Sequence, residues 1–314
     1  MPQVQAVTGP IDTASFGFTL MHEHVVTRSP GLFEAWPHLW DRAKEVQRAI
    51  TLLRQAKEAG IDTMIDLTTI DLGRDVAFVR EVAEQVDVKI VMCTGVWRNP
   101  PRDFTPADAE EIAGLFVRDI EQGMEGGTIR AGVIKLATEP DVDELNEKIL
   151  RAGARAHRRT GVPISTHHYV HTQCGLSQQN IFEDEGVDLS RVVIGHSGDS
   201  EDDAYLKSIM DRGSTIGMDR FGIDRMLSTE KRTATVARLC KAGYADRMVL
   251  SHDANSYMDT TPPDRKAEIM PNWHYLHITN DVLPALREQG VSEDDIRKMT
   301  VDNPRRIFEQ QGAY

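Results

Sequence analysis

The sequence has few cysteines, no long apolar run and no cluster of basic residues, and each absence narrows its class. Its three cysteines, Cys93, Cys174 and Cys240, are odd in number and widely spaced, which argues against a disulfide framework or a thiolate zinc site. No run approaches the ~18 apolar residues of a membrane span. Residues 1–7 lack the basic start and apolar core of a secretory signal. We therefore expect a cytoplasmic protein without a membrane partner.

The charge balance argues against a nucleic-acid partner. Acidic residues number 49 and basic residues 36, for a net charge of −13. Binding to a phosphate backbone depends on clustered positive charge. Hydrophobic residues make up 40% of the chain and charged residues 27%, as in ordinary soluble proteins with a substantial core. The 314 residues suffice for two average domains or for one large (β/α)8 barrel, which takes about 250 residues or more.

Short apolar segments that read as strands alternate along the chain with segments of helical periodicity. The predicted strands are 16–20, 63–67, 89–93, 132–136, 162–166, 191–195, 214–218 and 247–251. The predicted helices are 41–58, 75–85, 106–122, 141–160, 178–185, 202–212, 229–242, 271–289 and 292–300. Segments 1–15, 25–40 and 255–270 read as a polar lead-in and two long loops.

This alternation predicts a parallel sheet covered on both faces. Eight such units favour an α/β fold of the (β/α)8 TIM-barrel type, as a single domain over residues 1–314. An open doubly wound sheet is the alternative. No G-x-G-x-x-G follows the first strand, so a dinucleotide-binding interpretation lacks its main support.

Candidate metal ligands lie at the ends of the predicted strands. In an extended strand, residues two apart face the same way, so His22 and His24 present two imidazoles on one face. A loop that happens to carry two histidines is the simpler explanation of this pair by itself. The active site of such a barrel lies at the carboxyl ends of its strands, however, and further candidates occupy those positions. They are Lys135, His167, His196 and Asp253.

Nitrogen and oxygen ligands without thiolates suit zinc, manganese, cobalt or iron(II). Lys135 is the unusual member of this set, because an ammonium group repels a metal ion. A lysine paired with a carboxylate is the ordinary interpretation. Burial instead lowers a lysine pKa and yields a neutral amine, which can add carbon dioxide to form a carbamate with two oxygens.

Four motifs together resemble the phosphotriesterase family of the amidohydrolase superfamily, most closely its phosphotriesterase-like lactonases. They are residues 19–24 (TLMHEH), 132–135 (GVIK), 194–197 (IGHS) and 302–304 (DNP).

The resemblance implies that His22, His24 and Asp253 hold the more buried of two divalent ions. His167 and His196 would hold the more exposed one, and carboxylated Lys135 would bridge the two together with a hydroxide. Zinc is the first expectation, with cobalt, manganese or iron as alternatives. Two such ions lower the pKa of a bridging water. The resemblance implies that Asp253 is a ligand and also the acid/base that takes the proton of this water. The resemblance also implies a homodimer.

Substrate choice is expected to depend on residues around this centre. Residues 218–222 (MDRFG) resemble the lactonase branch, where an arginine corresponding to Arg220 borders the substrate. Trp97 stands where many such lactonases have tyrosine. The 255–270 loop is expected to form a lid, with Tyr257 and Trp273 lining an acyl-chain pocket.

The expected activity is hydrolysis of N-acyl-homoserine or related lactones, with promiscuous organophosphate hydrolysis. A genuine phosphotriesterase is the alternative enzyme, and a catalytically inactive barrel used for binding is the non-enzymatic one. His168 and His171 are assigned no catalytic role, and His252 is expected to be structural.

Overall fold

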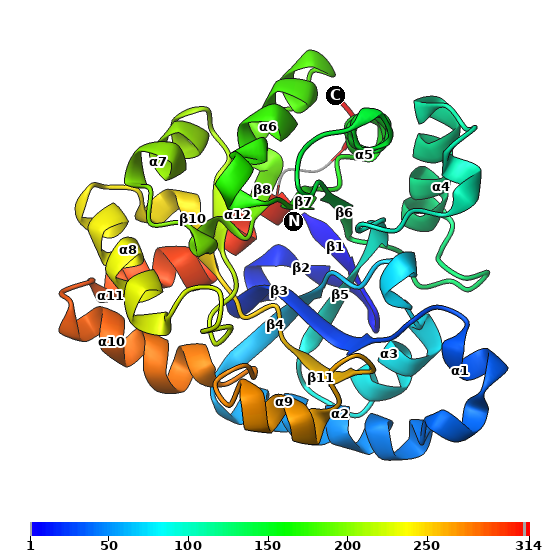
Figure 1. The fold of residues 1–314 in the computed structure, drawn as a ribbon, viewed down its shortest axis with the longest axis horizontal. Coiled ribbons are helices and arrows are strands. Elements are labelled where there is room, and N and C mark those ends of the chain that lie inside the picture. The colour runs from blue at the N-terminus through cyan, green and yellow to red at the C-terminus, as the bar shows by residue number, and fades with distance from the viewer. Residues whose placement is uncertain (1, 310–311) are drawn as a thin grey trace.

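A barrel of parallel strands wrapped by helices forms the centre of the computed structural model, which describes residues 2–309 and 312–314 (Figure 1). The strands pair in the order β10-β9-β8-β7-β6-β5-β4-β3-β11. Both faces of the strands are covered, so they consist of nearly continuous apolar runs. Their bounds are β3 Phe18–Thr27, β4 Ile61–Asp66, β5 Lys89–Gly95, β6 Val133–Ala137, β7 Ile164–His167, β8 Val192–Gly195, β9 Thr215–Met218, β10 Met248–Leu250 and β11 Asn255–Met258.

The barrel closes where the last strand is broken in two. β10 pairs with β9 on one side, and β11 pairs with β3 on the other. Between them, the backbone N–H of Asp253 donates to the carbonyl of His22 at 3.0 Å, and that of His24 donates to the carbonyl of Ala254 at 2.8 Å. When β10 and β11 are counted as one interrupted strand, the nine strands of the sheet form an eight-stranded barrel. The predicted (β/α)8 barrel is therefore confirmed over the open sheet.

The outer layer consists of the helices that connect successive strands (Figure 1). The predicted amphipathic segments form them, and aspartate or serine side chains cap several of their first turns. The main helices are α2 Arg42–Glu58, α3 Val76–Ala83, α4 Ala109–Glu121, α5 Glu144–Thr160, α6 Cys174–Asp184, α7 Asp203–Asp211, α8 Thr229–Lys241, α10 Leu283–Glu288, α11 Glu293–Arg297 and α12 Asn303–Glu309. None of the helices in the described part of the chain is long and apolar enough to cross a membrane.

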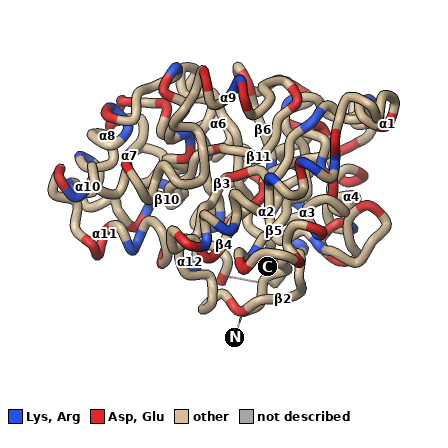
Figure 2. Tube along the Cα trace, turned by 90° about the horizontal axis from the view of Figure 1, so that it is seen from below, with Lys and Arg blue, Asp and Glu red and all other residues tan. Residues whose placement is uncertain are grey.

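Several segments differ from the prediction. The polar lead-in forms a hairpin of β1 Gln3–Ala6 and β2 Gly9–Asp12, which lies at the termini's end of the barrel together with α12 (Figure 2). The loop at 25–40 includes the end of β3 and a short helix, α1 Leu32–Ala35. The predicted lid loop contains β11 and α9 Pro263–Ile269. The predicted helix 271–289 begins only at the π-helical turn Ile278–Val282.

Apolar side chains from alternate strand positions fill the part of the barrel away from the carboxyl ends of the strands. Met21, Ile65, Val91, Val133 and Val249 belong to this inner cluster, together with Phe16 and Phe308 from beyond the strand ends. The larger apolar cluster lies between strands and helices. The barrel is thus a packed core below, and its polar interior lies toward the carboxyl ends of the strands.

Candidate metal centre

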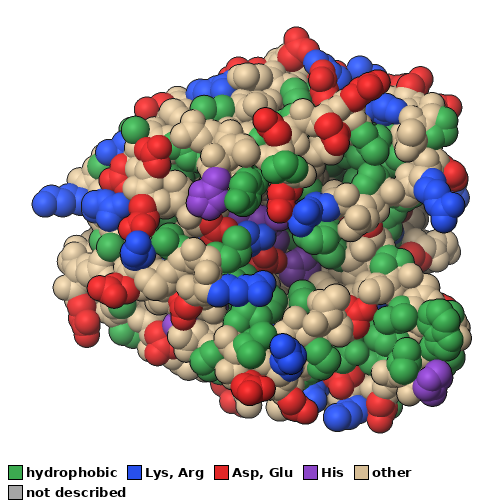
Figure 3. All heavy atoms as spheres, in the orientation of Figure 1, with side chains coloured by type: hydrophobic (Ala, Val, Ile, Leu, Met, Phe, Trp, Pro, Cys, Tyr) green, Lys and Arg blue, Asp and Glu red, His purple; other side chains and the backbone are tan. Residues whose placement is uncertain are grey.

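A cavity of about 250 Å³ opens at the carboxyl ends of the strands. Histidine, acidic and basic side chains gather in the hollow at the centre of the face in Figure 3. The structure brings all six predicted ligands to its lining, from five different stretches of the chain. They are His22, His24, Lys135, His167, His196 and Asp253.

An irregularity in β3 delivers the two histidines of its His-x-His sequence. Leu20 pairs with Met64 and Glu23 with Asp66, so three steps along β3 match two along β4. Such bulges re-aim side chains and are frequent beside active sites. As a result, Met21 packs into the apolar core below, while His22 and His24 both face the cavity.

The side chains of His22, His24 and Asp253 converge closely enough to share one cation. Nε2 of His24 lies 2.9 Å from Oδ1 of Asp253, and Nε2 of His22 lies 3.5 Å from the same oxygen. Potential ligand atoms of the three residues all lie within 4.8 Å of one another. The amine of Lys135 lies 3.3 Å from His22 Nε2. Two imidazole nitrogens and one carboxylate, all buried or nearly so, fit a divalent transition-metal ion.

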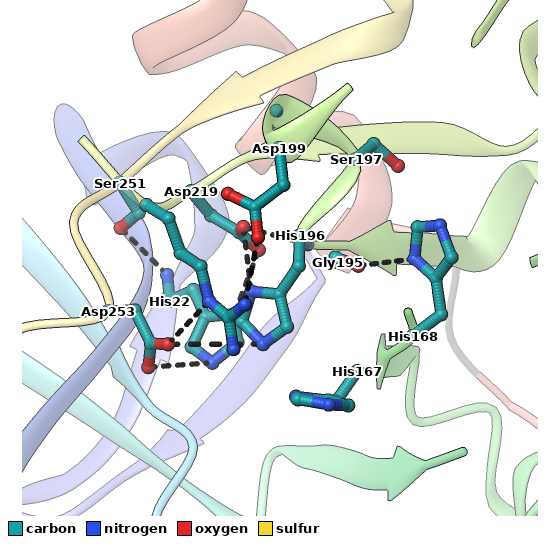
Figure 4. A network of polar contacts seen from close by, with 12 residues as sticks. His22, His167, His168, Gly195, His196, Ser197, Asp199, Asp219, Ser251 and Asp253 are labelled. Carbon is teal, nitrogen blue, oxygen red and sulfur yellow. Dashed lines mark hydrogen bonds and ion pairs between the residues drawn. The ribbon is translucent and has the colours of Figure 1, made fainter. Parts of the chain in front are cut away.

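Polar partners hold the other ring nitrogen of these histidines on the side away from the cavity. Asp219 binds Nδ1 of His22 at 2.8 Å and Nδ1 of His196 at 3.0 Å, as Figure 4 shows. The hydroxyl of Thr68 lies 2.9 Å from Nδ1 of His24. Histidines that ligate metals usually bind a carboxylate or another polar group through their second nitrogen. We therefore interpret Asp219 and Thr68 as a supporting shell for these histidines, and the trio His22, His196 and Asp219 is not counted as a separate cation site.

His167 approaches the same space from β7, and its ring centroid lies 4.5 Å from that of His196 (Figure 4). Its Nε2 lies 2.7 Å from the carboxylate of Glu139, and its Nδ1 accepts a hydrogen bond from the indole N–H of Trp97 at 3.3 Å. The hydrogen bond with His167 lowers the pKa of Glu139. Sequence reasoning missed Glu139, Asp219 and Thr68. Their signal was that each follows shortly after a predicted strand.

Burial keeps three of the candidate ligand imidazoles in the neutral form that metals require. It lowers the pKa of His167 to about 3, lowers that of His22 with help from Lys135, and lowers that of His196 with help from Arg220. These imidazoles are therefore neutral near pH 7, and neutral imidazole is the form that ligates metals. Burial also lowers the pKa of Lys135 to about 8. A substantial fraction of Lys135 is thus a neutral, nucleophilic amine at mildly alkaline pH.

Asp253 is held as a carboxylate. Burial alone would raise its pKa, but His22, a hydrogen bond with His24 and the charge of Arg220 outweigh burial and keep the pKa well below the usual range. Asp253 thus carries negative charge at neutral pH, as a metal ligand and a proton acceptor both require.

Two of the candidate ligands have left-handed backbone conformations. Among the described residues, four non-glycine residues have clearly positive φ, and His196 (+66°) and Asp253 (+56°) are two of them. This conformation costs about 1–2 kcal/mol for a residue with a side chain. Strained residues of this kind concentrate at functional sites, where the surroundings over-determine them.

Arg220 links the centre to a buried chain of alternating charges. Its Nε donates to Oδ2 of Asp253 at 3.1 Å and its Nη1 to Oδ2 of Asp199 at 2.8 Å. Arg232 in turn pairs with Asp199 at 2.6 Å. Burial alone would lower the pKa of Arg220, but the two carboxylates outweigh it and raise that pKa, so the guanidinium stays charged at the cavity wall.

Of the three other predicted substrate residues, two line the cavity and one does not. Trp97 and Trp273 line the cavity, and the indole N–H of Trp273 donates to the backbone carbonyls of His252 and Asp253. Tyr257 is not in the cavity lining. Its ring packs on the opposite side of β11, 6.3 Å from Phe33 and 6.1 Å from Trp40, because neighbouring residues of a strand face opposite ways.

The remaining histidines have structural partners or lie outside the cavity lining. His168 bonds to the carbonyl of Gly195 and to the hydroxyl of Tyr205, and Figure 4 shows it turned away from the centre. His252 is wholly buried and bonds to Glu23. His171 is not part of the lining.

Comparison with known proteins agrees with this geometry. A sequence model described as the phosphotriesterase family matches residues 2–308. The chain is 48% identical to a "Phosphotriesterase homology protein" of Mycobacterium tuberculosis, with 100% of both chains covered. It is 38% identical to an "Aryldialkylphosphatase" of Saccharolobus solfataricus, over 95% of this chain and 96% of that one. A solved structure titled "Structure of the phosphotriesterase from Mycobacterium tuberculosis" superposes with a TM-score of 0.97 at 48% identity, with 100% of both chains covered.

Proposed function

The chain belongs to the phosphotriesterase family, and from this premise we propose that it is a binuclear metal-dependent hydrolase that opens lactones, with weaker activity on phosphotriesters. The convergence of His22, His24 and Asp253 beside a buried lysine is the observation that carries the proposal. N-acyl-homoserine lactones are the proposed substrate class.

In this proposal His22, His24 and Asp253 would hold the more buried ion, and His167 and His196 would hold the more exposed one. Lys135, once its neutral amine has added carbon dioxide and released a proton, would supply carbamate oxygens as further ligands. When bound, such ions would lower the pKa of water and polarise the carbonyl or phosphoryl oxygen of the substrate. Zinc is the first candidate, and cobalt, manganese or iron have the same ligand preferences.

The proton of the attacking water is assigned to Asp253. Its ionised carboxylate faces the cavity, and an acceptor with a fixed orientation is what general base catalysis requires. Arg220 fixes that orientation through its bond to Oδ2 and leaves Oδ1 on the side of the two histidines. The protonated Asp253 can then return the proton to the ring oxygen that leaves the carbonyl carbon.

The surroundings of the centre support an acylated lactone as substrate. Leu72, Ile223, Met226 and Trp273 give the cavity apolar walls, and the guanidinium of Arg220 offers hydrogen-bond donors to a carbonyl oxygen. A second cavity of about 600 Å³ adjoins the first and shares Leu72, Trp97 and Met258 with it. An apolar chain attached to a small polar ring fits this pair of cavities.

The substrate class can be tested by comparing two substrates on one preparation. We expect kcat/KM for a long-chain N-acyl-homoserine lactone to exceed that for paraoxon by about 100-fold or more, because the long acyl chain buries more apolar surface in the two cavities than the ethyl groups and aryl ring of paraoxon do. A short-chain lactone serves as the matched control and should lose much of the advantage. Equal or higher efficiency on paraoxon would favour the phosphotriesterase alternative.

Two features motivate that alternative. Trp97 presents an indole N–H, already bonded to His167, and has no hydroxyl to position a lactone. One relative carries the name aryldialkylphosphatase. A catalytically inactive barrel is a weaker alternative, because mere binding does not require six converged ligand side chains. A homodimer and a cytoplasmic location are proposed from the family resemblance and the composition.

A further inference from the structure

The hydrolysis proposed above gives no role to Glu23, the residue between the two histidines of β3. Its side chain is 0% exposed, and its ion-pair partner is His252 rather than a lysine or arginine. A buried carboxylate is costly unless hydrogen bonds satisfy it. The contacts of Glu23 therefore indicate what it is used for.

Four hydrogen bonds of this carboxylate go to one short segment, residues 251–254. Oε1 accepts from the hydroxyl of Ser251 at 2.9 Å and from the backbone N–H and Nδ1 of His252 at 2.9 and 2.6 Å. Oε2 accepts from the backbone N–H of Ala254 at 2.8 Å. The two oxygens thus accept hydrogen bonds from the residues immediately before and after Asp253.

These hydrogen bonds surround Asp253, a candidate ligand with a strained backbone conformation. Asp253 has a φ of +56° in the gap between β10 and β11, where the sheet ladder is interrupted. A residue with a side chain stays in that conformation only where its neighbours enforce it. The N–H of Asp253 itself donates to the carbonyl of His22, which completes the attachment of this segment to β3.

The same residue connects all three proposed ligands of the inner ion. His22 and His24 flank Glu23 on β3, and Asp253 lies between the two residues whose N–H groups Glu23 binds. Ser251 reinforces the link, because its hydroxyl oxygen also accepts from the backbone N–H of His22 at 2.8 Å. One carboxylate therefore sets the distance between the histidine pair and Asp253.

We propose that Glu23 is the positioning residue of the inner metal site: it holds Asp253 in its left-handed conformation against β3, so that the Asp253 carboxylate and both histidines meet at one ion. The inference rests on the proposed metal centre and adds to it a requirement outside the ligands themselves. It predicts that metal affinity depends on Glu23 even though Glu23 does not touch the ion.

The test replaces Glu23 with glutamine in the full chain. Glutamine keeps the shape but has one carbonyl oxygen and one NH2 group, so either the pair 251–252 or Ala254 loses its acceptor. The metal-free protein is titrated with Co²⁺ in competition with a chelator, and the visible ligand-field absorption is recorded. We expect Glu23→Gln to bind its tighter Co²⁺ about tenfold or more weakly, with an altered spectrum, while its far-UV circular dichroism matches that of the wild type.

Glu45→Gln is the matched control, since Glu45 is also a buried glutamate, but it lies on the outer helix α2 and pairs with Arg48. It should leave Co²⁺ affinity unchanged. A second pair of variants covers the case in which Glu23→Gln does not fold. His252→Leu removes the Nδ1 contact with Glu23, whereas His252→Asn keeps a donor near that position, so asparagine should restore affinity that leucine loses.

A folded Glu23→Gln protein with wild-type affinity and spectrum would overturn the role of Glu23, as would equal affinities of His252→Leu and His252→Asn. A wild-type chain that binds no Co²⁺ would instead contradict the metal centre itself. The two failures are therefore distinguishable.

Discussion

Replacing Asp253 with asparagine is expected to lower kcat/KM for lactone hydrolysis by a factor of about 10³ or more. Asparagine preserves the shape of the side chain but cannot accept the proton of the attacking water, and loss of general base catalysis alone costs about 10²–10⁴-fold. The amide also makes a weaker metal ligand than the carboxylate whose oxygen lies 2.9 Å from His24 Nε2. Steady-state kinetics with metal in excess measure the effect.

Asp87→Asn is a suitable control, because the Asp87 side chain is 90% exposed and should leave kcat/KM unchanged. Metal content should be determined on the same Asp253→Asn sample, to separate loss of the base from loss of the ion. A pure, metal-loaded Asp253→Asn protein with activity within about threefold of the wild type would contradict the assigned role.

Replacing Lys135 with alanine is expected to lower activity by a factor of about 10² or more, because it removes the side chain that we propose links the two ions. The wild-type Lys135 side chain is 1% exposed and its amine contacts His22, so the space that it leaves can admit only a small molecule. Alanine leaves room for a short carboxylic acid in place of the carbamate. Added acetate or propionate should therefore restore part of the activity of Lys135→Ala and leave the wild type unaffected.

The pH dependence of carbamate formation follows from the lowered pKa of Lys135, about 8. Carbon dioxide adds to the neutral amine, whose fraction rises as pH increases toward and past 8. Reactivation of metal-free wild-type protein with Zn²⁺ should accordingly be faster at pH 8 than at pH 6.5 and should require bicarbonate. Reactivation that ignores bicarbonate, or a Lys135→Ala protein that carboxylic acids do not rescue, would argue against the carbamate.

The barrel and its cavity residues were predictable because they depend on local pattern. Apolar runs separated by amphipathic helices predict parallel strands, and the carboxyl ends of such strands meet at one face. Lys135, His167 and Asp253 follow directly from that rule. The hairpin of β1 and β2 was missed because its short strands carry few apolar residues, with Val4 and Ala6 as the buried ones.

The supporting shell was not predictable in the same way, because it depends on contacts between distant parts of the chain. His22 and Asp219 are 197 positions apart, and Glu23 and Ala254 are 231 apart. Asp219 follows a predicted strand and Glu23 lies between His22 and His24, but no local pattern identifies the partners of these two carboxylates. Only the closed barrel brings Asp219 beside His22 and residues 251–254 beside Glu23.

Tyr257 illustrates how one misassigned element displaces a side chain. As part of a loop it was expected to line the substrate pocket, but residues 255–258 form the strand β11 against β3. Strand geometry then fixes consecutive side chains on opposite faces, so Met258 lines the cavity and Tyr257 packs outward against Phe33 and Trp40. The strand β11, which closes the barrel, thus also decides which of its residues line the cavity.

The central claim, a two-ion centre built by His22, His24, Lys135, His167, His196 and Asp253, is tested most directly by the metal content of the purified chain. Protein produced with added Zn²⁺, freed of loosely bound metal and analysed by mass spectrometry, should contain about two equivalents per chain. His22→Ala should contain about one or fewer. A wild-type protein with no bound divalent metal under these conditions would contradict the account.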